Sequence, residues 1–137
     1  MDVKECIELL YDLKILDKKL LDLFEKKIGI SLTRFQIIKY LHKSSSSTSK
    51  QISQSLEIDA AAVTRHIKIL EKEGYVIKRR NENNNREVLV ELSEKAHEEI
   101  RRCERETTVQ DIIGNEFTEK DLKDLVSLLK KFNENFK

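Results

Sequence analysis

The sequence predicts a mainly α-helical fold with one small β-hairpin. Its 137 residues suit a single domain, and the lack of proline, the three glycines and the many Lys, Glu, Leu and Ile residues favour helices. Apolar residues recur at helical spacing along most of the chain. Between residues 76 and 92 the pattern changes to alternation around an asparagine-rich turn, which is typical of two paired strands.

The first predicted helix runs from Val3 to about Lys27, and Gly29 ends it. Its apolar residues occupy much of the circumference: Ile7, Leu10, Leu13, Leu16, Leu20, Leu21, Leu23 and Phe24. A helix that is apolar on more than one side needs more than one partner surface. We therefore expect part of this surface to meet a second subunit.

A second helix is expected over residues 34–42, because Thr33 and Gln36 have the spacing of a capping box. The polar residues 44–47 then predict a turn. A third, short helix is expected over 50–56, capped by a hydroxyl residue at position 48 or 49.

The stretch 59–76 predicts the helix around which the fold is organised. Asp59 is a favourable N-cap, residues 60–62 are alanines, and Gly74 can take the left-handed conformation that ends a helix. One face is apolar and the other is polar or basic, with Thr64, Arg65, Lys68 and Lys72. A basic helix with an almost bare first turn suits the major groove of DNA, where the backbone must approach the base edges. The alternative is an ordinary amphipathic helix with a solvated charged face.

Together, the helices over 50–56 and 59–73 form a helix-turn-helix unit. The basic residues 78–80, the polar turn 81–85 and a second strand over 88–92 then predict a hairpin. A hairpin directly after a recognition helix is a wing, and Arg86 at its tip suits a narrow, electronegative minor groove.

Two more helices complete the chain. Ser93 is expected to cap a connecting helix that continues to about Ile113, and Thr118 is expected to cap the last one. The predicted fold is therefore mainly α with a small β-wing, in one domain over 1–137. A winged helix-turn-helix over 31–93 and a connecting helix over 94–113 lie between terminal helices over 1–28 and 116–137.

The charge distribution and composition limit the classes of function that this chain is expected to have. The net charge is only +1, but positive residues outnumber negative ones between 64 and 86, which is the footprint of a surface that binds the DNA backbone. No apolar run is long enough to span a membrane, and the two cysteines cannot form a secreted disulfide framework, so we expect a cytoplasmic protein. The sequence has no phosphate-binding glycine loop and no nucleophile-elbow motif, which argues against an enzyme and against a cofactor.

The most specific stretches of the chain are VTRHIKILEKEGYVIKRR, from Val63, and NNREVLVELSEKA, from Asn84. They resemble the recognition helix and wing of the MarR family of winged-helix transcription regulators, and the likeness extends over essentially the whole chain. Three positions depart from the family pattern. Asn84 replaces the acid that commonly braces the wing arginine, Glu87 adds a negative charge beside Arg86, and Ala96 replaces a glycine.

The resemblance implies a homodimer formed by the first and last helices, which binds double-stranded DNA at a pseudo-palindromic operator and probes successive major grooves about 34–36 Å apart. Such a protein is expected to be a repressor. The implied DNA-binding residues divide into base readers (Ala60, Ala61, Thr64, Arg65), phosphate neighbours (Ser49, Gln51), a minor-groove residue (Arg86), and phosphate contacts or strand-base braces (Lys68, Lys78, Arg79).

The family also implies two further sites. Many members release DNA when a small planar effector binds a cleft, for which Tyr11, Phe24, Phe35 and Tyr40 are the candidate wall residues here. A branch of the family senses peroxide through a cysteine of the first helix, and Cys6 lies about one turn from that position.

The histidines and Cys103 have no metal-ligand spacing, so no metal site is expected. Two alternatives to a ligand-responsive repressor stay open at this level: a thiol-based redox regulator that uses Cys6, and a winged-helix module for protein assembly.

Overall fold

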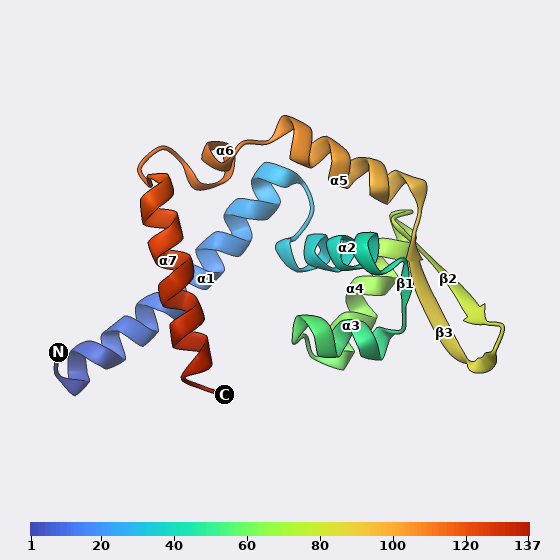
Figure 1. Cartoon of the computed structure of the whole chain (residues 1–137), viewed down its shortest axis with the longest axis horizontal. Coiled ribbons are helices and arrows are strands. Elements are labelled where there is room, and N and C mark those ends of the chain that lie inside the picture. The colour runs from blue at the N-terminus through green and yellow to red at the C-terminus, as the bar shows by residue number, and fades with distance from the viewer. The chain divides into compact units, whose positions relative to one another are not determined.

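The computed structural model describes all residues from 1 to 137 and contains seven helices and a three-stranded antiparallel sheet (Figure 1). The chain divides into two compact units, Met1–Glu106 and Thr107–Lys137. The predicted fold class, mainly α with a small β-wing, is confirmed.

The first unit contains five helices: α1 (Val3–Ile28), α2 (Leu32–Ser44), α3 (Ser49–Leu56), α4 (Ala60–Lys72) and α5 (Glu94–Glu106). Its sheet contains β1 (Ser46–Ser47), β2 (Val76–Asn81) and β3 (Asn84–Leu92) in the order β1-β3-β2. The turn expected at 44–47 therefore contains a short strand, in which Ser46 pairs with Glu91 and Ser47 with Val90. Because the partner strand is distant in sequence, no local pattern could reveal it.

One core holds this unit together. Its buried apolar residues come from α2, α3, α4, α5, the paired strands and the segment before α2: Ile30, Phe35, Ile37, Ile38, Leu41, Ile52, Val63, Ile67, Leu70, Val76, Val90, Leu92, Ala96 and Ile100. The helix α4 and the β2–β3 hairpin therefore share one core and are positioned by the same packing.

Most helix ends follow the predicted caps. Thr48 and Gln51 form a reciprocal capping box at α3, and Asp59 accepts hydrogen bonds from two backbone N–H groups of α4. The predicted start of α2 is wrong: the helix begins at Leu32, and the Ser31 hydroxyl, not Thr33, caps it by accepting from the Arg34 N–H. Thr33 lies inside the helix, where its hydroxyl cannot serve the first turn.

Gly74 has a φ of +81°, as expected for the residue that reverses the chain after α4. The N–H of Tyr75 donates to the Leu70 carbonyl at 2.8 Å and so closes the helix end. This tight turn carries the chain directly from α4 into β2.

The second unit contains α6 (Val109–Ile113) and α7 (Glu119–Glu134). The prediction of one continuous helix over 94–113 is wrong, because α5 ends at Glu106 and a new helix begins after Thr108. Thr108 and Asp111 form a reciprocal capping box, which satisfies the first N–H groups of a fresh helix and so favours a break. Thr118 caps α7, as predicted.

The two terminal helices, α1 and α7, bury none of their residues. Only Phe24 and Ile28, at the end of α1, reach the core, where the Phe24 ring meets Phe35 edge-on at 5.7 Å between centroids. Large apolar side chains elsewhere on both helices are exposed, among them Ile7 at 61% and Leu128 at 63%. None of the helices is both long and apolar enough to cross a membrane.

Candidate nucleic-acid interface

The first turn of α4 is accessible and almost free of side chains. Ala60 and Ala61 are exposed, and the Asp59 carboxylate accepts from the N–H groups of Ala61 and Ala62 at 3.1 and 3.3 Å. Thr64 is also exposed, and its hydroxyl donates to the Ala60 carbonyl at 3.1 Å. The backbone at this end of α4 can therefore approach a flat surface closely, as groove entry requires.

The predicted basic contacts differ in their pairing. Arg65, Lys68 and Arg86 are exposed and take part in none of the ion pairs of the structure. Lys78, in contrast, lies 3.3 Å from Glu71 of α4, and Arg79 lies 3.1 Å from Glu91 of β3. These two residues brace the base of the wing, while the other three keep a free charge for a ligand.

Ser49 and Gln51 lie at the start of α3, and both are exposed. The Gln51 side-chain oxygen accepts from the Thr48 N–H at 2.9 Å, and the Thr48 hydroxyl accepts from the Gln51 N–H at 3.1 Å. The capping box thus fixes the Gln51 carboxamide and leaves its NH₂ group free to donate to an acceptor such as a phosphate oxygen.

The wing tip is held by neutral side chains. The Asn84 oxygen accepts from the Arg86 N–H at 3.2 Å, so this residue organises the turn although it lacks the charge of the acid usual in the family. Arg80 donates to the Asn85 carbonyl at 2.7 Å. Sequence reasoning passed over Arg80, because only the folded hairpin brings it to the tip.

His66 of α4 turns partly into the molecule. It is half-buried, and its Nδ1 is buried without a hydrogen-bond partner. Burial lowers the pKa of His66, and the positive charges of Arg34 and Arg65 lower it further. Arg34 of α2 lies 3.4 Å from Glu25 and was also missed by sequence reasoning, since nothing local connects it to α4.

The aromatic residues proposed for an effector cleft do not line one cavity within the chain. Phe24 and Phe35 contact each other at the core, and Tyr11 is exposed on α1. Tyr40 lies at a separate hollow of about 200 Å³ and receives hydrogen bonds from Ser47 and Ser55, which lower its pKa. A larger hollow of about 440 Å³ lies where α1, α2 and α3 meet, with Asp17, Leu21, Leu32, Thr33, Gln36, Ser55, Leu56 and Ile58 around it.

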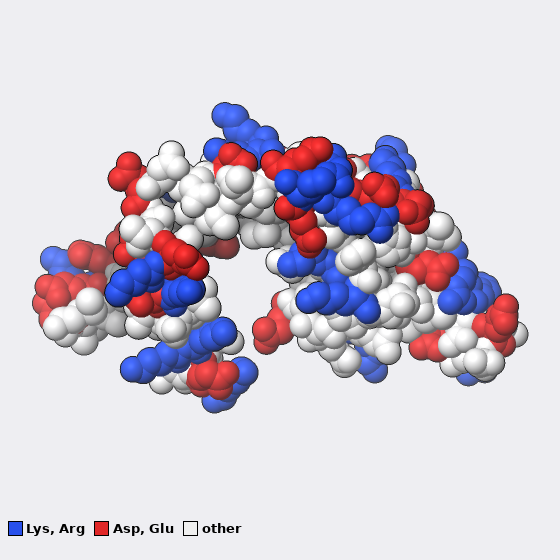
Figure 2. Space-filling model, turned by 45° about the horizontal axis from the view of Figure 1, so that its top comes forward, with Lys and Arg blue, Asp and Glu red and all other residues white.

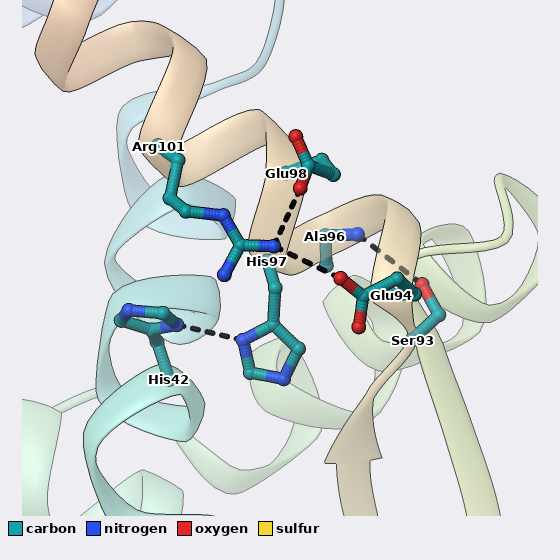
Figure 3. A network of polar contacts seen from close by, with 7 residues as sticks. All are labelled: His42, Ser93, Glu94, Ala96, His97, Glu98 and Arg101. Atoms are coloured by element: carbon teal, nitrogen blue, oxygen red, sulfur yellow. Dashed lines mark hydrogen bonds and ion pairs between the residues drawn. The ribbon is translucent and has the colours of Figure 1, made fainter.

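The histidine and cysteine side chains form no recognisable metal centre. His42 of α2 and His97 of α5 approach within 2.7 Å between their Nδ1 atoms, and Arg101 bridges Glu94 and Glu98 nearby (Figure 3). The structure contains no group of three or more His, Cys, Asp or Glu residues that could hold a metal ion. Cys6 is exposed on α1, and Cys103 packs against the core.

Charge is mixed over much of the surface. In the view of Figure 2, Lys and Arg side chains alternate with Asp and Glu, so this face carries no uniform basic patch. On α5, for example, Arg101 and Arg102 each pair with two glutamates. Arg65, Lys68 and Arg86, on α4 and the wing, take part in no such pair and so keep an unneutralised charge.

Comparison with known proteins agrees with this geometry. Residues 30–88 match the sequence model of the MarR family. The chain is 34% identical over 110 residues to an uncharacterised HTH-type transcriptional regulator, YdgJ of Bacillus subtilis, a match that covers 79% of this chain and 67% of the relative. It is 31% identical over 100 residues to the transcriptional regulator SarA of Staphylococcus aureus, covering 72% and 80% of the two chains.

Solved structures show the same fold. A mutant of MarR from E. coli, complexed with operator DNA, superposes with a TM-score of 0.81 at 24% identity, over 96% of this chain and 99% of that one. A MarR-like transcription regulator from Bacillus cereus gives a TM-score of 0.80 at 24% identity, over 98% and 99%.

Proposed function

Because this chain belongs to the MarR family of DNA-binding transcriptional regulators, and not to a family of enzymes, we propose that it represses transcription as a homodimer bound to a pseudo-palindromic operator. The observation that carries this proposal is the exposed, bare first turn of α4, together with the unpaired Arg65 and Lys68 of the same helix and the unpaired Arg86 of the wing. A regulator of this kind acts on DNA in the cytoplasm.

Each residue of the interface receives a role from its chemistry. Ala60, Ala61, Thr64 and Arg65 face the base edges in the major groove, where Arg65 can donate two hydrogen bonds to one guanine. Ser49, Gln51 and Lys68 contact phosphates and fix the register of α4. Arg86 enters the minor groove, and Lys78 and Arg79 hold the wing in place for it.

The exposed apolar surfaces of α1 and α7 support the homodimer. Neither helix buries a residue within the chain, and α7 alone exposes Leu125, Val126, Leu128, Leu129 and Phe132. Contiguous apolar surface of this extent marks an interaction site. In the proposed dimer, helices within 1–28 and 116–137 pack against their counterparts, and each subunit presents one α4 to the operator.

A small effector is the proposed release signal. The hollow between α1, α2 and α3 connects a dimerisation helix to the helix-turn-helix, so a molecule bound there can favour one spacing of the two α4 helices over another. An effector lowers DNA affinity only by the difference between its affinities for the two arrangements.

The test is selection of DNA by the intact protein. Promoter fragments from the source genome are incubated with the protein at two salt concentrations, with excess non-specific competitor. We expect a few fragments that share an inverted repeat to be retained, and Arg65→Ala to lose that selectivity. Arg105→Ala is the matched control, because it removes the same charge from α5. If no fragment is retained, or if Arg65→Ala and Arg105→Ala behave alike, the proposal is refuted and an assembly module becomes the better reading.

A further inference from the structure

The wing has two faces of different charge. Directly opposed residues of β2 and β3 share a face, so Lys78 and Val90, and Arg80 and Val88, lie together on the face that turns toward the core and α4. The other face carries Ile77, Arg79, Leu89 and Glu91, and the acids of the wing strands lie on it.

Glu87 directly follows Arg86, the proposed minor-groove residue, in the chain. Side chains alternate along a strand, so β3 directs Arg86 and Glu87 to opposite faces. This separation depends on regular pairing of the two strands, and the pairing becomes irregular between Arg80 and Asn81. Near this irregularity, a hydrogen-bond partner is needed to keep the Glu87 carboxylate on its own face of the hairpin.

Asn81 supplies that partner. Its side-chain NH₂ donates to the Glu87 carboxylate at 2.9 Å, and its side-chain oxygen accepts from the Asn83 N–H at 3.0 Å. Asn81 and Glu87 are both half-buried, whereas Arg86 is exposed and unpaired. One side chain therefore ties the acid to the turn on the face away from α4.

We propose that Asn81 is a positioning residue that holds the Glu87 carboxylate away from Arg86 and thereby keeps the Arg86 guanidinium free for DNA. The value of this role for binding rests on the proposed function, in which Arg86 contacts the operator. Glu87 follows Arg86 directly in the chain, and its carboxylate could neutralise the guanidinium. Asn81 prevents this, which explains how the chain tolerates an acid at position 87.

The first experiment needs no DNA. In nitrogen-15-labelled protein, the Arg86 Nε–Hε resonance reports whether a carboxylate has reached the guanidinium. Asn81→Ala should shift this resonance, and the double variant Asn81→Ala, Glu87→Gln should return it to the wild-type position. Asn83→Ala is the matched control, since the Asn83 side chain makes no hydrogen bond in the structure, and it should leave the resonance in place.

The second experiment measures affinity for a selected operator fragment by competition. Asn81→Ala should weaken binding by roughly two- to fivefold, the range expected when an exposed ion pair competes for Arg86. Adding Glu87→Gln should restore affinity to about the wild-type level, although Asn81 is still missing.

Two results would overturn the positioning role. One is an Arg86 resonance that does not move in Asn81→Ala. The other is a shift and a loss of affinity that persist in the double variant, which would show that Asn81 acts through wing structure or touches DNA itself. If the resonance behaves as expected but Arg86→Ala binds DNA like the wild type, the positioning role stands and the proposed minor-groove contact fails.

Discussion

Replacing Arg86 by glutamine should reduce both the operator affinity and its dependence on salt, and replacing Arg79 by glutamine should change both less. The structure makes this distinction although both residues are arginines of the wing. The Arg86 guanidinium has no carboxylate partner, whereas the Arg79 Nε lies 3.1 Å from Glu91. Only an unpaired cation adds its full charge to the interface, because a paired one is already largely neutralised.

The magnitude follows from counterion release. Each neutralised phosphate contributes about −0.9 to the slope of log affinity against log salt concentration, and a dimer loses two Arg86 side chains, so the slope should become shallower by about 1.8. Between about 50 and 200 mM salt, the wild type should then lose about twelvefold more affinity than Arg86→Gln loses. For Arg79→Gln the change in slope should be less than about half as large.

Fluorescence anisotropy with a labelled operator, measured over a series of salt concentrations, gives both slopes directly. Thermal melting of the free variants checks that each remains folded. The reasoning would be refuted by equal changes in slope for the two variants, since the Arg79–Glu91 pair would then have no effect on the available charge. An unchanged slope in Arg86→Gln would instead remove Arg86 from the interface.

Three further predictions concern stability and assembly. Asp59→Ala should lower the free energy of unfolding, measured in urea, by about 1 kcal/mol, because two N–H groups of α4 lose their acceptor. Asp59→Asn should retain most of the wild-type stability, because its side-chain oxygen can still accept these hydrogen bonds. Acid should destabilise the protein through His66, because its pKa in the folded state lies below its ordinary value of 6.5. The contribution of neutral His66 to the free energy of unfolding is complete above pH 6.5 and is lost as the pH falls through the folded pKa. His66→Gln should therefore flatten the dependence of the urea midpoint on pH, and an unchanged slope would contradict this origin. Leu128→Glu on the exposed face of α7 should shift the sedimentation coefficient from that of a dimer to that of a monomer, whereas Lys130→Glu should not.

The elements of the fold that sequence could predict are those defined by local signals. Asp59, the alanines that follow it and Gly74 mark both ends of α4, and period-two alternation marks β3. Local signals are insufficient where two of them lie close together. Ser31 caps α2 although Thr33 and Gln36 have the spacing of a capping box, and Thr108 starts a new helix although apolar residues continue at helical spacing beyond it.

Other features depend on contacts between residues distant in sequence. The strand β1 exists only because β3 offers it an edge, and the difference between Arg79 and Arg86 exists only because Glu91 lies across the hairpin from one of them. Composition could locate a basic region over 64–86 but could not say which of its charges are neutralised. The roles of individual site residues are for this reason the least predictable part of the interface.

The pairing of charges also bears on how a chain with a net charge of +1 could select an operator. Non-specific affinity for DNA grows with the number of phosphates that a protein neutralises, whereas base contacts set the preference for one sequence. On α5 and on the outer face of the wing, basic side chains are paired with acids: Arg79, Arg101 and Arg102. The unpaired Arg65 and Arg86 occupy positions where, in the proposed complex, they would meet the grooves. In that complex, the unpaired arginines would add binding energy where sequence and groove width are read.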